Sequence, residues 1–159
     1  MTTEFTKIKI VDDRTHLEWQ VRRNDDSFDT FSLDSKDKPA PSFSLKLLDF
    51  RSFVNDICDL RLKETELHTL EIRGLSLSYS GDKHIMGATI TALKALPDRN
   101  APLVVNTPHL IEDYYSENGD PKCLLPQDLV TLIYEIQIEA EHFIKGFRFQ
   151  LNLFDVRNN

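Results

Sequence analysis

Alternating apolar and polar residues at the start of the chain predict paired strands. The runs 7–11 and 17–21 each alternate, and the polar residues 12–15 separate them. Such alternation on both sides of a short polar turn is typical of a β-hairpin. A second polar turn at residues 24–27 leads into a third short strand at 28–33.

After this hairpin the apolar period lengthens from two residues to between three and four. Between Ser42 and Leu60 the apolar side chains recur at helical spacing, at Phe43, Leu47, Phe50, Val54 and Ile57. This spacing places them on one side of a helix, so the segment predicts one amphipathic helix.

Two longer strands are expected next, at residues 67–79 and 84–96, joined by a turn at 80–83. In the first of them the apolar parity changes at Gly74. A β-bulge at Arg73-Gly74 reconciles the two halves, because a bulge inserts one residue and exchanges the faces of the strand.

A connection rich in proline follows over residues 97–125, with one short strand at 103–105. Connections this long are uncommon unless they are functional or mobile. The tip, residues 112–120, is acidic, aromatic and rich in turn formers, which makes Asp113, Tyr114 and Tyr115 candidate contact residues. The alternative for this tip is a solvated excursion of the surface.

A second helix is expected from Pro126 to Lys145, with Gly146 as its stop. Its core face consists of Leu129, Leu132, Ile133, Ile136, Ala140 and Phe143. Tyr134 and Ile138 lie on the opposite side, which predicts a second cover for this helix. The cover is either the sheet and loop of the same chain or a second subunit.

Together these elements predict an α+β fold, with an antiparallel sheet of five to seven strands and two helices packed on one face. We expect residues 1–146 to form a single domain. Residues 147–159 then form a C-terminal segment, which is either an edge strand or a docking tail.

Composition narrows the class of partner. The chain has 159 residues and a net charge of −7, from 26 Asp and Glu against 19 Lys and Arg. Nucleic acids are bound mainly through clustered Lys and Arg, so direct binding of nucleic acid is disfavoured. The N-terminus lacks a signal-peptide pattern and no apolar run has membrane-spanning length, so we expect a cytoplasmic protein that does not enter the membrane.

Catalytic and metal-binding patterns give no support for an enzyme. Cys58 and Cys123 are far apart and form no CxxC pair. Glu135, Glu139 and His142 share one edge of the second helix, but a di-iron site requires further carboxylates on facing helices. A solvated edge with pairing along the helix explains these residues better. We therefore predict no catalytic residues, no metal and no cofactor.

The segment Gln150-Leu151-Asn152-Leu153-Phe154 resembles the pentapeptide by which bacterial polymerases, mismatch-repair proteins and initiator regulators bind the DNA sliding clamp. In that family the pattern is QL(S/D)LF. The resemblance implies that Gln150 makes the polar contacts, while Leu153 and Phe154, following Leu151, enter a hydrophobic cleft. Asn152 departs from Ser or Asp but keeps a small polar group. The same alternation is also typical of a half-buried edge strand.

A wider resemblance runs from about residue 40 to residue 154. Its elements are Pro41-x-Phe43, Gly87-x-x-Ile90-Thr91, Asn106-Thr107-Pro108 and a pattern from Glu139 to Phe154. Together they resemble a group of small phage and prophage proteins. The resemblance implies a phage protein made in a bacterial cytoplasm, where replication modules act beside the host clamp, and it supplies no catalytic residues.

The functional hypothesis is a non-enzymatic accessory protein of DNA replication or metabolism that binds the bacterial sliding clamp through Gln150, Leu151, Leu153 and Phe154. The alternative is a protein-binding inhibitor of host machinery or defence, which acts through residues 112–120. A third hypothesis, a single-stranded nucleic-acid binder with Trp19 and Phe side chains as stacking surfaces, conflicts with the net charge.

Overall fold

The alternating segments of the chain form a seven-stranded antiparallel sheet. The computed structural model describes residues 3–12, 14–112 and 121–148. The strands are β1 (Thr3–Val11), β2 (Arg14–Arg22), β3 (Phe28–Ser35), β4 (Leu70–Ser80), β5 (Ile85–Lys94), β6 (Leu103–Asn106) and β7 (Leu110–Ile111). The strand order is β3-β2-β1-β4-β5-β6, and β7 also pairs with β5.

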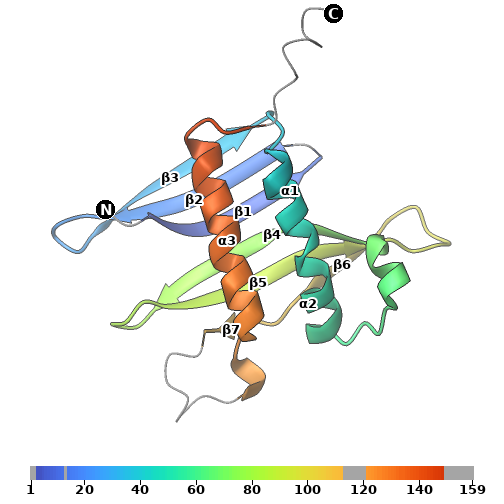
Figure 1. Ribbon diagram of the computed structural model, residues 1–159. Coiled ribbons are helices and arrows are strands. Elements are labelled where there is room, and N and C mark those ends of the chain that lie inside the picture. Colours follow the sequence, from blue (N-terminus) through green and yellow to red (C-terminus); the bar gives the residue numbers. More distant parts are fainter. Residues whose placement is uncertain (1–2, 13, 113–120, 149–159) are drawn as a thin grey trace, which may run out of the picture.

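Three α-helices cover one face of this sheet (Figure 1). They are α1 (Pro41–Leu48), α2 (Phe50–Ile57) and α3 (Gln127–Ile144), and two short 3-10 helices, η1 (Glu64–Thr69) and η2 (Pro121–Cys123), lie in the connections. The α+β class and the antiparallel sheet with helices on one face are therefore confirmed. The other face, called the open face below, carries none of the helices in the described part of the chain.

The single helix predicted over Ser42–Leu60 is split at Asp49 into α1 and α2. The Nε of Arg51 donates to the carbonyl of Leu48 at 3.1 Å, so the Arg51 side chain satisfies a helix-end acceptor at the break. Asp49 itself stays in the right-handed helical region, with φ −67° and ψ −18°. Phe43, Leu47, Phe50 and Val54 consequently remain on one buried face, as predicted.

The core lies between the sheet and the helices. One apolar row crosses five strands in register, and its members are Leu33, Leu17, Ile8, Leu75 and Ile90. The predicted core face of α3 is buried throughout, and Phe43 of α1 meets Phe143 of α3 edge to face at 6.4 Å. Tyr79 joins the layers, because its hydroxyl donates to the carbonyl of Phe5 and lies 3.3 Å from Oε1 of Gln137.

Two rows of mostly polar residues cross the open face, one residue before and one residue after the buried row along the strands. One contains Ser32, Glu18, Lys7, Ser76 and Thr89, and the next contains Asp34, His16, Lys9, Gly74, Thr91 and Asn106. The side-chain period of two along each strand produces this separation into apolar and polar faces.

Two β-bulges adjust the register of the sheet. The register of β4 against β5 shifts between Ile72 and Gly74, which confirms the predicted bulge. A second shift, between Phe5 and Lys7 in β1, was not predicted. It allows Phe5 and Ile8 to be buried on the same face although their parities differ.

Candidate functional site

The C-terminal segment leaves the domain at a well-defined end of α3. Gln150, Leu151, Leu153 and Phe154 lie outside the described residues, but the chain is described as far as Arg148. Gly146 has φ +104°, its N–H donates to the carbonyl of Phe143, and the Phe147 N–H donates to that of His142. These two bonds and the left-handed glycine are the Schellman motif, which ends a helix sharply.

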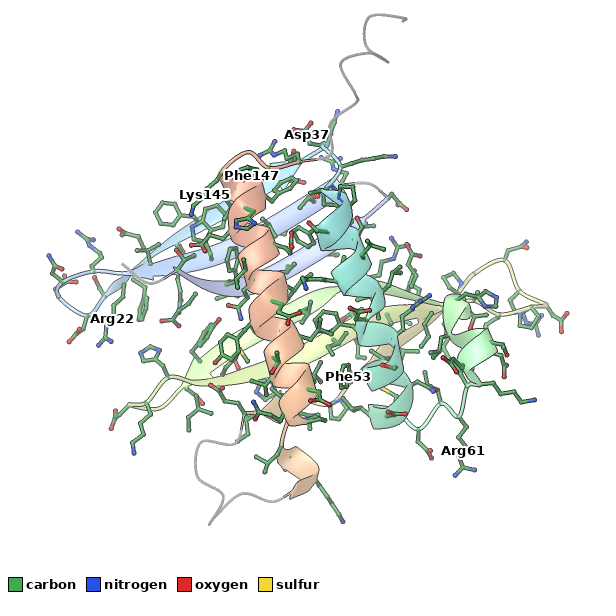
Figure 2. The ribbon with its side chains drawn as sticks, viewed as in Figure 1. Arg22, Asp37, Phe53, Arg61, Lys145 and Phe147 are labelled. Atoms are coloured by element: carbon green, nitrogen blue, oxygen red, sulfur yellow. The ribbon has the colours of Figure 1, made fainter. Side chains whose placement is uncertain are left out.

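Arg148 fixes the chain immediately after this turn. Its guanidinium bonds to the carboxylate of Asp37 and lies over the Phe143 ring, 4.3 Å from the ring centre. Arg148 also forms an isolated antiparallel bridge with Pro39. Asp37, Lys145 and Phe147 lie together at this end of the molecule (Figure 2). The segment that follows therefore starts from a fixed point beside the β3–α1 connection.

The connection that contains the acidic tip is held by hydrogen bonds at Glu112 and at Leu125. Asp113, Tyr114 and Tyr115 lie outside the described residues, whereas Glu112 is bound on three sides. Its N–H donates to the carbonyl of Met86, and its carboxylate accepts from the Met86 N–H and, at 3.0 Å, from the Tyr134 hydroxyl. At the far end the Leu125 N–H donates to the carbonyl of Ile111 at 2.7 Å, so the two ends of the connection are held together.

Tyr134 is part of this anchor. Burial first, and then the hydrogen bond to Glu112, raises the pKa of Tyr134 to about 12. The contact shows that the chain's own loop covers part of the outer side of α3. Ile138, on the same side, remains 52% exposed.

The described anchors of the two candidate segments lie at opposite ends of α3. Arg148 is held beside Phe143, whereas Leu125 precedes the first turn of the helix. An 18-residue helix is about 27 Å long at about 1.5 Å per residue. A change in one segment is therefore not expected to disturb the anchor of the other.

The acidic edge of α3 contacts α1. Glu135 accepts from Nζ of Lys46 at 2.9 Å, and Glu139 accepts from the Ser42 hydroxyl at 2.8 Å. These carboxylates thus bridge two helices rather than pair along their own helix as expected. Among the described residues, no group of three or more His, Cys, Asp or Glu side chains is placed to hold a metal.

The thiol and the aromatic side chains considered from the sequence occupy structural positions. Burial raises the pKa of the Cys58 thiol, which disfavours the nucleophilic thiolate. Trp19 stacks on Phe31 with ring centres 5.7 Å apart and also contacts Phe5, which is buried under the helices. These rings therefore do not lie with the basic residues of the open face. No helix in the described ranges is both long and apolar enough to cross a membrane.

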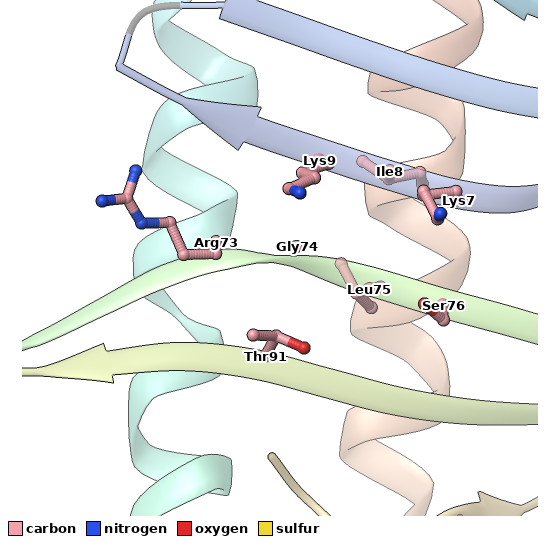
Figure 3. A pocket seen from close by; sticks show the side chains of 8 residues that line it. All are labelled: Lys7, Ile8, Lys9, Arg73, Gly74, Leu75, Ser76 and Thr91. Carbon is pink, nitrogen blue, oxygen red and sulfur yellow. The ribbon is translucent and has the colours of Figure 1, made fainter. Parts of the chain in front are cut away.

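A basic hollow on the open face was missed by sequence reasoning. It has a volume of about 200 Å³ and lies where β1 pairs with β4 (Figure 3). Its lining is Lys7, Ile8, Lys9, Arg73, Gly74, Leu75, Ser76 and Thr91, which includes three cationic side chains and no carboxylate. The Lys7-x-Lys9 spacing and the bulge at Gly74 were visible in the sequence, but the pairing of β1 with β4 was not.

Comparison of the chain with protein-family models, with curated proteins and with solved structures finds no significant match. The fold and the described sites define a class only, an α+β protein with one antiparallel sheet and a helical layer on one face.

Proposed function

We propose that this protein is a non-enzymatic accessory factor of DNA metabolism that binds the bacterial sliding clamp through Gln150, Leu151, Leu153 and Phe154. The observation that carries the proposal is the anchor at Arg148. This anchor follows the sharp end of α3 and fixes the chain two residues before Gln150. A docking peptide tethered in this way is presented near a rigid surface, which lowers the entropy lost on binding.

The packing of the described domain supports this assignment. Its buried apolar core runs from Phe5 to Phe143, so the core described here is assembled before the pentapeptide begins. The next residue with a large apolar side chain beyond Ile144, Phe147, is 64% exposed. The apolar residues of the pentapeptide are therefore candidates for binding another protein.

Charge supports an indirect route to DNA. The chain carries a net charge of −7, and from Phe147 to Phe154 its only charged residue is Arg148, which is paired with Asp37. An acidic protein gains little from the phosphate backbone, so a role in replication runs through a protein partner. The phage-like pattern of residues 40–154 suggests the cytoplasm of a bacterial host as the setting.

The test is binding of the full chain to an immobilised bacterial clamp, measured by surface plasmon resonance. A Gln150→Ala/Leu153→Ala/Phe154→Ala variant removes the three anchors, and Leu45→Ala, an exposed apolar residue on α1, is the matched control. Buried anchors contribute about 2 kcal/mol or more each, so the loss of one anchor weakens binding about 30-fold and the triple variant is expected to bind more weakly still. Equal binding by wild type and triple variant refutes the proposal.

The motif also makes a positive prediction at its middle position. The family pattern has Ser or Asp where this chain has Asn152. Asn152→Ser is therefore expected to bind the clamp at least as tightly as wild type. Markedly weaker binding by this variant contradicts a clamp-type reading of the segment.

A second candidate function rests on the anchored loop. Glu112 and Leu125 hold the two ends of the connection that contains Asp113, Tyr114 and Tyr115. A loop with fixed ends suits an inhibitor that presents aromatic and acidic side chains to a host protein.

Lysate pull-downs with two deletion variants separate the candidates. Because the loop ends are held together, residues 113–120 can be replaced by a short Gly-Ser linker without opening the fold. Loss of the captured protein with this replacement, and its retention when 149–159 are removed, supports the inhibitor. The opposite pattern supports clamp binding.

A further inference from the structure

We propose that the basic hollow on the open face binds a small dianionic ligand of the phosphomonoester class. This site is independent of the C-terminal segment and of clamp binding. It is formed where β1 and β4 meet, with Lys7 and Lys9 on one side and Arg73, Ser76 and Thr91 on the other (Figure 3).

The shape of the hollow follows from Gly74. A Cβ at this position would lie 2.4 Å from the carbonyl oxygen of Ile8 and 2.9 Å from Cα of Lys9. The backbone of β1 therefore approaches β4 closely at this position. In the polar row that contains Lys9 and Thr91, Gly74 contributes no side chain, and the β1 backbone fills the space that a Cβ would take.

Arg73 lies at the edge of the hollow, next to two carboxylates. Arg73 is only 16% exposed, yet its Nε and Nη1 are buried without a hydrogen-bond partner in the described part of the chain. Its carboxylate neighbours, Asp12 and Glu71, are each 3.6 Å away, too far for a hydrogen bond. The guanidinium is held beside these two carboxylates at the edge of the hollow, where it contributes positive charge rather than a free donor.

The two lysines of the lining differ in how free their charges are. The Lys9 side chain is exposed and forms no ion pair or hydrogen bond within the described ranges. Lys7 is 3.7 Å from Glu18, a loose surface pair.

These groups select the ligand chemistry. Two ammonium groups, with a guanidinium at the edge of the hollow, match an anion with several oxygens. The Ser76 hydroxyl is exposed and supplies a further donor, whereas the Thr91 hydroxyl already donates to Oδ1 of Asn106 at 2.7 Å. A volume of about 200 Å³ is below the range of about 300–1,000 Å³ for drug-sized ligands, so it suits one phosphate group.

An adjoining hollow has room for the rest of a phosphate ester. It measures about 370 Å³ and shares Lys7 and Lys9 with the first. Its other lining residues are Val11, Asp12, Arg14, His16 and Asp34, so it offers donors, acceptors and an apolar side chain. This mixed lining suits the neutral, hydroxyl-bearing part of a small phosphorylated molecule better than a second phosphate.

The test is a ¹⁵N–¹H NMR titration of the full chain at constant ionic strength, with inorganic phosphate, adenosine monophosphate and sodium chloride in separate arms. Saturable shifts of the backbone amides of Lys9, Gly74 and Thr91 are expected with both phosphates and not with chloride. A tighter response to the monophosphate than to inorganic phosphate indicates that the second hollow takes part. Shifts that track ionic strength in all three arms overturn the proposal.

Substitutions localise the effect. Lys9→Gln and Ser76→Ala change exposed side chains and are each expected to weaken phosphate binding about tenfold. Arg73→Lys keeps the charge beside Asp12 and Glu71, so it is expected to weaken binding less than Lys9→Gln does. Lys145→Gln, at the end of α3, is the control of equal charge change. If it weakens binding as much as Lys9→Gln does, there is no site at the hollow.

The two proposals can fail separately. The Gln150→Ala/Leu153→Ala/Phe154→Ala variant is expected to retain phosphate binding in full, because its substitutions lie outside the hollow. Loss of phosphate binding in this variant would contradict the placement of the site on β1 and β4.

Discussion

Replacing Gly74 by Ala tests the close approach of β1 and β4 on which both the sheet and the basic hollow depend. The new Cβ would lie 2.4 Å from the carbonyl oxygen of Ile8 and 2.9 Å from Cα of Lys9, and both atoms belong to the β1 backbone. Ordinary contacts of this kind are about 3.5–4 Å, so the two strands must separate by about 1 Å. No rotamer change relieves a clash with backbone.

The expected loss of stability in Gly74→Ala follows from the short pairing between β1 and β4. Only three residue pairs join β1 to β4, from Lys7↔Ser76 to Lys9↔Gly74. Overpacking costs about 1–3 kcal/mol, and each strained hydrogen bond adds up to about 1 kcal/mol. Replacing a glycine inside a strand by alanine also stabilises the folded state by about 0.5–1 kcal/mol, because the unfolded chain becomes less flexible. The net destabilisation is about 2–3 kcal/mol, or roughly 4–12 °C in Tm for a chain of this length.

Urea unfolding followed by the fluorescence of Trp19, the single tryptophan, measures this loss. Gly87→Ala is the matched control, because its new Cβ also lies 2.4 Å from a neighbour, but that neighbour is the exposed ring of His109, which can move aside. The control is expected to cost less than about 1 kcal/mol. A Gly74→Ala variant as stable as Gly87→Ala would refute the proposed strand contact.

Three further outcomes are expected. Arg148→Ala removes the Asp37 ion pair and the contact with the Phe143 ring, and should lower the free energy of unfolding by about 1–2 kcal/mol in urea; no change would contradict the anchor. Truncation after Arg148 should shift Tm, measured by circular dichroism, by less than about 2 °C, whereas a larger drop would mean that the tail packs on the domain as a strand. The raised pKa of Tyr134, about 12, means that the folded protein holds this proton more tightly than the unfolded chain does. The resulting stability is complete below about pH 10 and lost between about pH 10 and pH 12. The ultraviolet difference titration of wild type against Tyr134→Phe should therefore lack a midpoint near 10.

The spacing of apolar residues along the chain predicted most of the fold, because it indicates which side of each helix or strand is buried. The hairpin, the bulge at Arg73-Gly74 and the core face of α3 were all confirmed. The break at Asp49 was not predicted, because Asp49 keeps helical angles and the buried face continues through it. The bulge in β1 was also missed, since no glycine marks it between Phe5 and Lys7.

One of the candidate sites could be predicted from the sequence and another could not. A linear motif such as Gln150–Phe154 is legible in sequence, because its chemistry lies in neighbouring residues. The basic hollow is not, because Lys9 and Arg73 are separated by 64 positions and meet only through the pairing of β1 with β4. The predicted bulge gave the position of Gly74 but not the identity of the strand beside it.

The most direct test of clamp binding is displacement of a fluorescent clamp-binding peptide from the bacterial clamp, followed by fluorescence anisotropy. The peptide occupies the cleft that Leu153 and Phe154 are proposed to enter. The account predicts that the full chain releases the peptide and that the Gln150→Ala/Leu153→Ala/Phe154→Ala variant does not. Anisotropy that stays constant at saturating full chain would contradict it.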